Sequence, residues 1–459
     1  MSKSILGFSK MSKRKKLRWI VENFFKDPEN VMSELKSYWL SNEEQQRILD
    51  GFSENTISNY YLPYGVAPNF VINDKTYCVP MVIEESSVVA AASSAAKFWM
   101  GRGGFKAEVL CTKKIGQVHF YWNGSTDKLK GAFSDIKEEL VKAQAPITAN
   151  MEKRGGGVTD IELKDMTAVE AGYYQLKVSF ETCDSMGANF INSVLEKHAQ
   201  TLQQFVQLDD RFTKEEKEVE IIMSILSNYT PECLVRTWVE CPVEKLGKIG
   251  NLTAEQFAEK FNKAIRIAHL DPSRATTHNK GIFNGIDAVV LATANDFRAV
   301  EACGHTYAAR DGQYRSLSYC TVENGIFKFW IDLPIALGTV GGLTKLHPIA
   351  KRSLELLGNP GAEELMMIIA TTGLAQNFAA IRSLVTTGIQ QGHMKMHLLN
   401  ILNHLGASEK EVKEAVVYFK DRVVSFSAAR DFLELFRKDD TGSVNVMLNS
   451  QIRNNKKLT

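Results

Sequence analysis

The chain has 459 residues, of which 44% are hydrophobic and 24% are charged, and its formal net charge is +2. This length predicts two or three domains, and the near-neutral charge gives no case for a nucleic-acid or membrane partner. The seven cysteines are scattered without a CxxC pair, which favours reduced thiols in a cytoplasmic protein and argues against a zinc site or a disulfide framework. No signal-peptide core and no apolar run of about 18 residues occurs, so we expect a soluble chain without a membrane span.

The first part of the chain alternates between helical and extended patterns. Residues 17–52 show helical spacing, and residues 60–83 predict two strands joined by a turn at NDKTY. The next run, EESSVVAAASSAAKFWMGRGG, predicts a closely packed helix that opens at Ser86 or Ser87 and stops at Gly101.

A small α+β unit is predicted over residues 111–230. FKAEVLCTKKIGQVHFYW, from Phe105, predicts a hairpin, and a polar region follows it. YYQLKVSFETC alternates as a strand does, a helix is expected from about 187 to 205, and EVEIIMSIL predicts another strand. Strands around one or two helices indicate a domain inserted into a larger one.

The stretch from Asp271 to Asp296, DPSRATTHNKGIFNGIDAVVLATAND, concentrates polar side chains around small residues. Helical patterning over 252–261 precedes it, and a strand-like segment, AVVLATA, leads to Asp296. Arg274 and Lys280 suit a carboxylate and a developing oxyanion, so this glycine-punctuated loop indicates an anionic-substrate site. The alternative is a polar loop whose charges are merely solvated.

The C-terminal third is mostly helical in pattern. Residues 347–391 place apolar side chains near 3.6-residue spacing, and a glycine interrupts the pattern before His393. Ser408 and Glu411 form a capping-box pattern. We expect the part from about residue 387 onward to be a separate mobile segment.

Two further segments can carry chemistry. DSMGAN, from Asp184 to Asn189, begins a helix without a G-x-G-x-x-G pattern, and a helix N-terminus suits a pyrophosphate. The alternative for this segment is an ordinary helix cap. A histidine titrates near neutral pH and suits a general acid, so His393 is a candidate, although a lone histidine is more often a helix cap or a surface residue than a catalytic one.

Taken together, these segments resemble 3-hydroxy-3-methylglutaryl-CoA (HMG-CoA) reductase, most closely its soluble bacterial class II form. ENTIS (54–58) is similar to the family's ENVIG, and DSMGAN to its DAMGAN. The other matching segments are EESSVVAAAS, DPSRATTHNKGIFNG, ANDFRAVEA, GTVGGLTKLHP (338–348), GLAQN (373–377) and GHMKMH. They run in family order from about residue 50 to residue 400, and this joint order is specific although several single segments are weak.

The resemblance implies an α+β fold with three parts. A large mixed α/β substrate domain would comprise residues 1–110 and 231–386, with an inserted small, non-Rossmann, ferredoxin-like dinucleotide-binding domain at 111–230. A helical C-terminal flap would comprise residues 387–459. The implied reaction is the reduction of HMG-CoA to mevalonate and free CoA with two nicotinamide hydrides, as in the mevalonate pathway of isoprenoid biosynthesis.

The resemblance also implies roles for individual residues. Lys280 would stabilise the oxyanion, Glu85 would manage a proton, Asp296 would hold both in one network, and His393 would protonate the CoA thiolate. Arg274 would bind the substrate carboxylate. The other positions that match the family near the substrate are Ser87, Asn284, Gln376 and Asn377, and those on the cofactor side are Asp184, Met186, Gly187, Asn189, Asn228 and Thr148.

Cofactor choice depends on a departure from the family pattern. NAD-preferring relatives resemble KDQLLNSLGGG, where an aspartate faces the ribose hydroxyls, whereas this chain has ITANMEKRGGG. Thr148 takes the acidic position, and Lys153 and Arg154 follow it. Loss of the acid and the added cations favour a 2′-phosphate, so the sequence predicts NADPH rather than NADH.

Several alternatives stay open at this stage. The same enzyme could work oxidatively in mevalonate degradation with NAD, or the chain could be a non-catalytic acyl-CoA-binding protein or a thioesterase. The basic run at residues 10–18 is either solvated or in contact with the phosphates of CoA. Because the family assembles its site across a dimer, with ENTIS-like residues at the interface, we expect a homodimer or a higher homo-oligomer.

Overall fold

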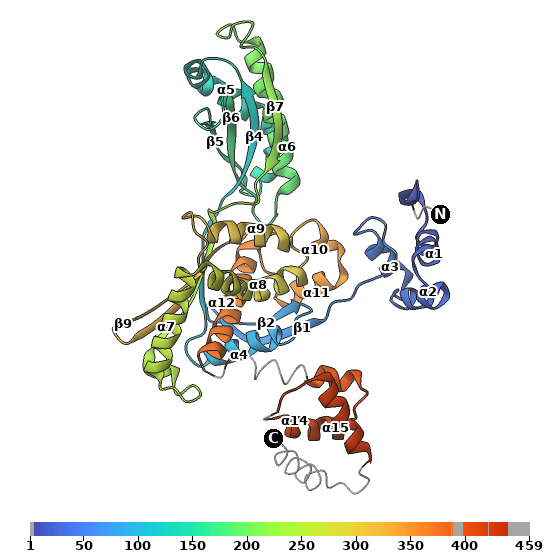
Figure 1. Cartoon of the computed structure of the whole chain (residues 1–459). Coiled ribbons are helices and arrows are strands. Elements are labelled where there is room, and N and C mark those ends of the chain that lie inside the picture. Colours follow the sequence, from blue (N-terminus) through green and yellow to red (C-terminus); the bar gives the residue numbers. More distant parts are fainter. Residues whose placement is uncertain (1–3, 387, 389–397, 421, 439–459) are drawn as a thin grey trace.

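The computed structural model describes residues 4–386, 388, 398–420 and 422–438. It is an α+β fold built on antiparallel sheets, and Figure 1 shows a central body with a smaller unit projecting from it. Helices α1 (Lys13–Phe24), α2 (Pro28–Ser37) and α3 (Glu43–Asp50) are set apart from this body in the same view. The predicted helical character of residues 17–52 is therefore confirmed.

The central body contains a two-stranded and a four-stranded antiparallel sheet with helices packed on them. The pair is β1 (Tyr64–Ile72) and β2 (Lys75–Val82), as predicted, and the larger sheet has the order β3-β8-β10-β9. The strands of the larger sheet are β3 (Lys106–Thr112), β8 (Cys233–Pro242), β9 (Ser318–Glu323) and β10 (Ile326–Pro334). The helices of the body are α4 (Val88–Met100), α7 (Ala254–Leu270), α8 (Pro272–Ala292), α9 (Phe297–Ala308), α10 (Leu343–Leu346), α11 (Pro348–Leu356) and α12 (Ala362–Val385).

Helix α12 is the centre of the hydrophobic core. It packs against α8, α4 and the larger sheet, and most of its residues are buried. Within the described residues it is also the one helix long and apolar enough to cross a membrane, but 83% of its apolar window is buried inside the fold. Its hydrophobicity is therefore explained by its place in the core.

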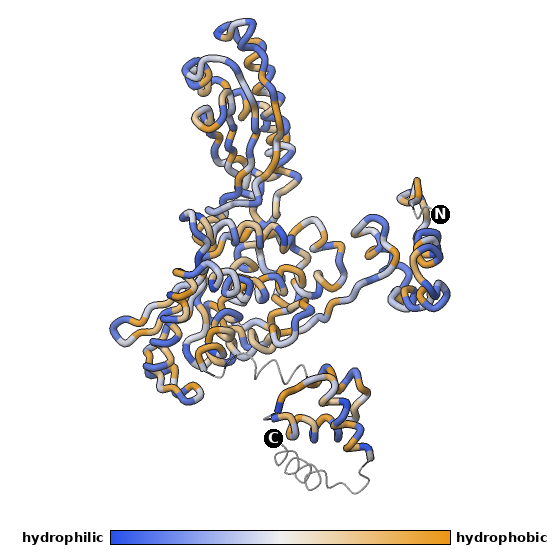
Figure 2. The backbone as a smooth tube through the Cα atoms, in the orientation of Figure 1, coloured by the Kyte–Doolittle hydropathy of each residue, from blue (hydrophilic) through white to orange (hydrophobic). Residues whose placement is uncertain are grey.

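The smaller unit has the ferredoxin-like βαββαβ order. Its strands β4 (Lys114–Trp122), β5 (Gly157–Asp165), β6 (Tyr173–Glu181) and β7 (Val219–Leu226) form an antiparallel sheet ordered β5-β6-β4-β7. Helices α5 (Thr126–Glu152) and α6 (Ala188–Leu208) pack together and close a separate hydrophobic core. Figure 2 shows hydrophobic and hydrophilic residues alternating along this unit, as expected for a sheet covered on one face.

A third hydrophobic cluster lies near the C-terminus. It includes Leu402, Phe419 and Phe432, with α14 (Glu409–Tyr418) and α15 (Phe426–Lys438) among its elements. Ser408 and Glu411 form the predicted capping box.

Three local predictions need correction. First, FKAEVLCTKKIGQVHFYW is not a hairpin, because one residue separates β3 from β4 and the two strands join different sheets. Second, the polar region that follows β4 contains α5 and β5. The many charged residues of α5 obscure its apolar stripe in the sequence, and that stripe is buried in the structure. The C-terminal third is mostly helical in its described part, as predicted, and also includes β9 and β10.

The third correction concerns AVVLATA, which lies mostly in α8 and is not a strand. The helix is buried between α12 and β2, so its apolar residues face the core around most of the helix. A short apolar run cannot distinguish a buried helix from a buried strand. Gly285 allows the close packing, since a Cβ there would lie 2.8 Å from the Thr372 backbone oxygen.

Candidate active site

A lysine–glutamate ion pair joins two segments that are far apart in the sequence. Lys280 Nζ on α8 lies 2.5 Å from Glu85 Oε2, in the loop between β2 and α4. Asn284, one turn later on α8, donates from Nδ2 to the same oxygen at 3.2 Å. The side chains of Lys280 and Glu85 are 61% and 37% exposed, so a ligand can reach both. The structure therefore brings three of the predicted site residues together.

The helix that carries Lys280 is fixed at its start by its own sequence. Asp271 caps α8 by accepting from the backbone N–H groups of Ser273 and Arg274, and Pro272 occupies the first turn. The Arg274 side chain is half-buried, and within the described residues it has no hydrogen bond or ion pair. Burial lowers the pKa of Arg274, so an anion bound beside it would replace the missing solvation.

The inner face of α8 is held by a buried polar network. His278 Nε2 lies 2.7 Å from Ser318 Oγ, and Ser318 donates to Asn377 Oδ1 at 2.8 Å. Asn279 donates to the Arg315 carbonyl oxygen at 2.8 Å. Asn377 is 1% exposed, so the structure uses it to tie α12 to β9 and does not present it to a ligand.

Two other predicted substrate residues have unusual surroundings. Ser87 precedes α4 in a left-handed conformation, with φ of 76°, and its hydroxyl does not cap the helix. A non-glycine residue in this region is strained, and such strain is concentrated at functional sites. Gln376 is 6% exposed, and its Oε1 is buried with no hydrogen-bond partner among the described residues.

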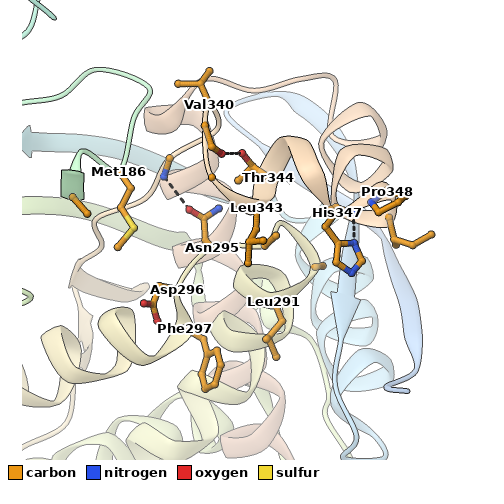
Figure 3. A pocket seen from close by; sticks show the side chains of 18 of the residues that line it. Met186, Leu291, Asn295, Asp296, Phe297, Val340, Leu343, Thr344, His347 and Pro348 are labelled. Carbon is orange, nitrogen blue, oxygen red and sulfur yellow. Dashed lines mark hydrogen bonds between the residues drawn. The ribbon is translucent and has the colours of Figure 1, made fainter. Parts of the chain in front are cut away.

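Asp296 does not join the lysine–glutamate pair in this structure. Its carboxylate caps α9, accepting from the N–H groups of Arg298 and Ala299, and it pairs with the Arg298 guanidinium at 2.9 Å. The predicted network of Asp296 with Lys280 and Glu85 is therefore corrected to a helix cap. The side chain instead lines the large cavity shown in Figure 3.

That cavity has a volume of about 1250 Å³ and lies where the central body meets the smaller unit. It is lined by the turn before α6, the end of α5, residues 338–350 and part of ENTIS. Figure 3 shows Asn295 accepting from the Gly338 N–H beside Met186, an interaction of 2.9 Å. The Lys280–Glu85 pair is not among the lining residues, although Val82, at the end of β2, and Leu291, on the same helix as Lys280, are.

The predicted cofactor residues divide into two groups. Met186, Gly187 and Asn189 line the cavity at the start of α6. Asp184 and Asn228 do not: Asp184 caps α12 by accepting from the Ala362 N–H, and Asn228 lines a small neighbouring void.

The predicted contact between Thr148 and the cofactor needs correction. It is fully buried, and its hydroxyl lies 3.4 Å from the Gln144 and Ala145 carbonyl oxygens within α5. It cannot contact a ligand in the cavity, because it lies on the inner face of the helix. The cavity is lined instead by Ile147, Asn150 and Met151 of α5 and by Arg154, which follows the end of the helix. Of these, sequence reasoning named only Arg154.

The local backbone fits a dinucleotide. Gly187 has φ of 85°, and a Cβ there would lie 2.5 Å from Thr182 Cγ2, so only glycine keeps the turn open. The first N–H groups of α6 have no partner inside the helix and can bind phosphate oxygens. The cavity is larger than typical small-ligand sites. His393, by contrast, lies outside the described residues.

Comparison with known proteins gives consistent matches over most of the chain. The family described as hydroxymethylglutaryl-coenzyme A reductase matches residues 14–398. The 3-hydroxy-3-methylglutaryl-coenzyme A reductase of Archaeoglobus fulgidus is 35% identical over 438 residues, covering 95% of each chain. A probable reductase of the same name from Borreliella burgdorferi is 31% identical, covering 88% of this chain and 87% of its own.

Solved structures agree with this result. The class II reductase of Streptococcus pneumoniae, bound to NADPH in open conformations, is 37% identical with a TM-score of 0.69. The match covers 83% of this chain and all of that one. The fold and these matches define an oxidoreductase with an inserted ferredoxin-like unit. The chain belongs to the HMG-CoA reductase family, and its predicted α+β fold and family are confirmed.

Proposed function

We propose that this chain reduces HMG-CoA to mevalonate and CoA with two molecules of NADPH. The observation that carries the proposal is the ion pair between Lys280 and Glu85, whose positions differ by 195 in the sequence. A cation held beside a carboxylate at an accessible surface can stabilise a developing oxyanion and exchange a proton with it.

The chain's own groups have distinct tasks in this proposal. Lys280 stabilises the oxyanion formed at the thioester carbonyl and again at the aldehyde. Glu85, oriented by Lys280 and Asn284, transfers the proton. NADPH, when bound, supplies the hydrides. His393 protonates the departing CoA thiolate, as the family resemblance implies.

Arg274 is proposed to bind the carboxylate of the substrate. It is on the same helix as Lys280, less than two turns before it, and has no acidic partner in the described part of the chain. The planar guanidinium suits bidentate binding of a carboxylate. We also place Ser87 and Gln376 near the substrate.

NADPH is favoured over NADH because Arg154 lines the cavity near the start of α6. Its Nε donates to the Asn150 carbonyl at 3.1 Å, and no carboxylate neutralises its guanidinium within the described residues. A 2′-phosphate would supply the missing anion. The similar pneumococcal enzyme is bound to NADPH.

We retain the division into a large domain (1–110 and 231–386), a small domain (111–230) and a C-terminal flap (387–459). Three separate hydrophobic clusters support it. A cytoplasmic homodimer is also proposed. The detached helices α1–α3 and the 90% exposed Tyr60 beside ENTIS offer a surface for a second subunit.

The test is the loss of NADPH absorbance with HMG-CoA, comparing wild type with Lys280→Ala. Removing the oxyanion-stabilising cation should lower kcat by at least about 100-fold. Lys263→Ala is the matched control, because Lys263 is exposed and pairs only with Glu259 in its own helix. Full activity of Lys280→Ala would refute the assigned role.

The same assay separates the alternatives. Release of CoA without nicotinamide would indicate a thioesterase, and binding of HMG-CoA without turnover would indicate a carrier. A preference for mevalonate, CoA and NAD would indicate the degradative direction.

A further inference from the structure

Lys114 is a buried lysine at the crossing between the two sheets. It is the first residue of β4, directly after the short link from β3, and only 4% of its surface is exposed. The described residues offer it no carboxylate within ion-pair distance. A lysine is rarely buried in this way without a paired acid, so its charge requires an explanation.

The ammonium group is directed at the turn before α6. Lys114 Nζ donates to Thr182 Oγ1 at 2.5 Å and to the Ser185 carbonyl oxygen at 3.0 Å. Thr182 Oγ1 also donates to the Ser185 carbonyl oxygen, at 2.6 Å. These bonds fix the inner side of the segment whose outer side, at Met186 and Gly187, lines the large cavity.

The nearest acidic residue is already engaged. Glu181 accepts from the Cys183 N–H at 2.7 Å through Oε1 and from the Thr112 hydroxyl through Oε2. Burial lowers the pKa of Lys114, while Glu181 acts in the opposite direction more weakly. The Lys114 ammonium donates to two oxygens behind the α6 N-terminus, where its charge has little local compensation, and a buried charge is only weakly screened by salt.

We propose that Lys114 is a positioning residue for the dinucleotide. It holds the Thr182–Gly187 turn and adds a buried positive potential to the N-terminus of α6, which together attract the phosphates of NADPH. The inference rests on the NADPH use proposed above. Asn228 lines the same small void as Lys114, behind the turn, and does not line the large cavity.

The experiment titrates NADPH, by its own fluorescence, into the full-length enzyme without substrate. Lys114→Met keeps the length and apolar contacts of the side chain but removes its charge, and we expect the Kd for NADPH to rise about tenfold. Lys113→Met is the matched control, because the adjacent Lys113 is partly exposed and pairs with Glu232. Its Kd should stay at the wild-type value.

Stability distinguishes this role from a structural one. Replacing a buried charge by an apolar group of similar size is often neutral or stabilising, so the Tm of Lys114→Met should equal or exceed that of wild type. The KM for HMG-CoA should change by less than about twofold, since the turn faces the dinucleotide. A lower Tm with equal losses for both ligands would overturn the proposal.

A second variant separates charge from hydrogen bonding. Lys114→Gln keeps a donor but no charge, and we expect it to bind NADPH as weakly as Lys114→Met. Wild-type affinity in either variant would overturn the proposal. Failure of the wild-type enzyme to bind NADPH would instead refute the proposed cofactor, so the two failures are distinguishable.

Discussion

The protonation of His278 should control the stability of the helix that carries Lys280. His278 is 2% exposed, and burial, with a smaller contribution from Arg274, lowers its pKa to about 3 from an ordinary value of 6.5. Ser318 donates to Asn377, so the Ser318 hydroxyl accepts from His278 Nε2. His278 Nδ1 is buried without a partner, so a proton there would have no acceptor.

Because the folded state lowers the pKa of His278, the protein should lose stability as the pH falls. The unfolded chain binds a proton at His278 below about pH 6.5, whereas the folded chain resists it down to about pH 3. Stability is therefore complete above the unfolded pKa and falls as the pH drops through this window. Between about pH 7.5 and about pH 5, one such group removes about 2 kcal/mol from the free energy of unfolding.

The assay is urea unfolding of wild type and His278→Gln at both pH values, followed by tryptophan fluorescence. Between these two pH values the free energy of unfolding should fall by about 2 kcal/mol less in the variant than in wild type. This difference does not depend on the stability of the variant at neutral pH. His404→Gln is the control, because the His404 side chain is exposed to solvent and its replacement should leave the wild-type pH dependence unchanged. Equal pH dependence in wild type and His278→Gln would refute the reasoning.

Three glycine substitutions test the close packing around the site. In α8, Gly285→Ala should destabilise the fold by about 1–3 kcal/mol, because its Cβ would lie 2.8 Å from the Thr372 backbone oxygen. Gly281, one turn earlier, has open space around it, so Gly281→Ala should stabilise the helix by about 0.5–1 kcal/mol. Urea unfolding measures both variants, and a change of the same sign in their free energies of unfolding would contradict the packing argument. Gly338→Ala would place a Cβ 2.5 Å from the Met186 backbone nitrogen, so steady-state kinetics should show a KM for NADPH raised about tenfold with the KM for HMG-CoA nearly unchanged. An unchanged KM for NADPH would show that the turn is not part of the cofactor site.

Local patterns in the sequence determined much of the fold. Alternation predicted β1, β2, β6 and β7, and capping residues predicted the limits of α4 and the start of α14, because these signals act within a few residues. The order of the motifs identified the family, and it marked Glu85, Lys280 and Asn284 as members of one site before their contacts were known.

Tertiary packing decided the rest. Whether AVVLATA is a helix or a strand depends on its neighbours, α12 and β2, and the separation of β3 from β4 depends on which sheet each strand joins. The orientation of a side chain depends on the face its helix buries, so Thr148 and Asn377 point into cores while Asn150, on the same helix as Thr148, lines the cavity. Lys114 and His278 have their altered environments only because distant segments exclude water from them. Motif order establishes the family and the chemically active groups. The three-dimensional fold decides which of those groups meet, because burial and contact arise between residues far apart in the chain.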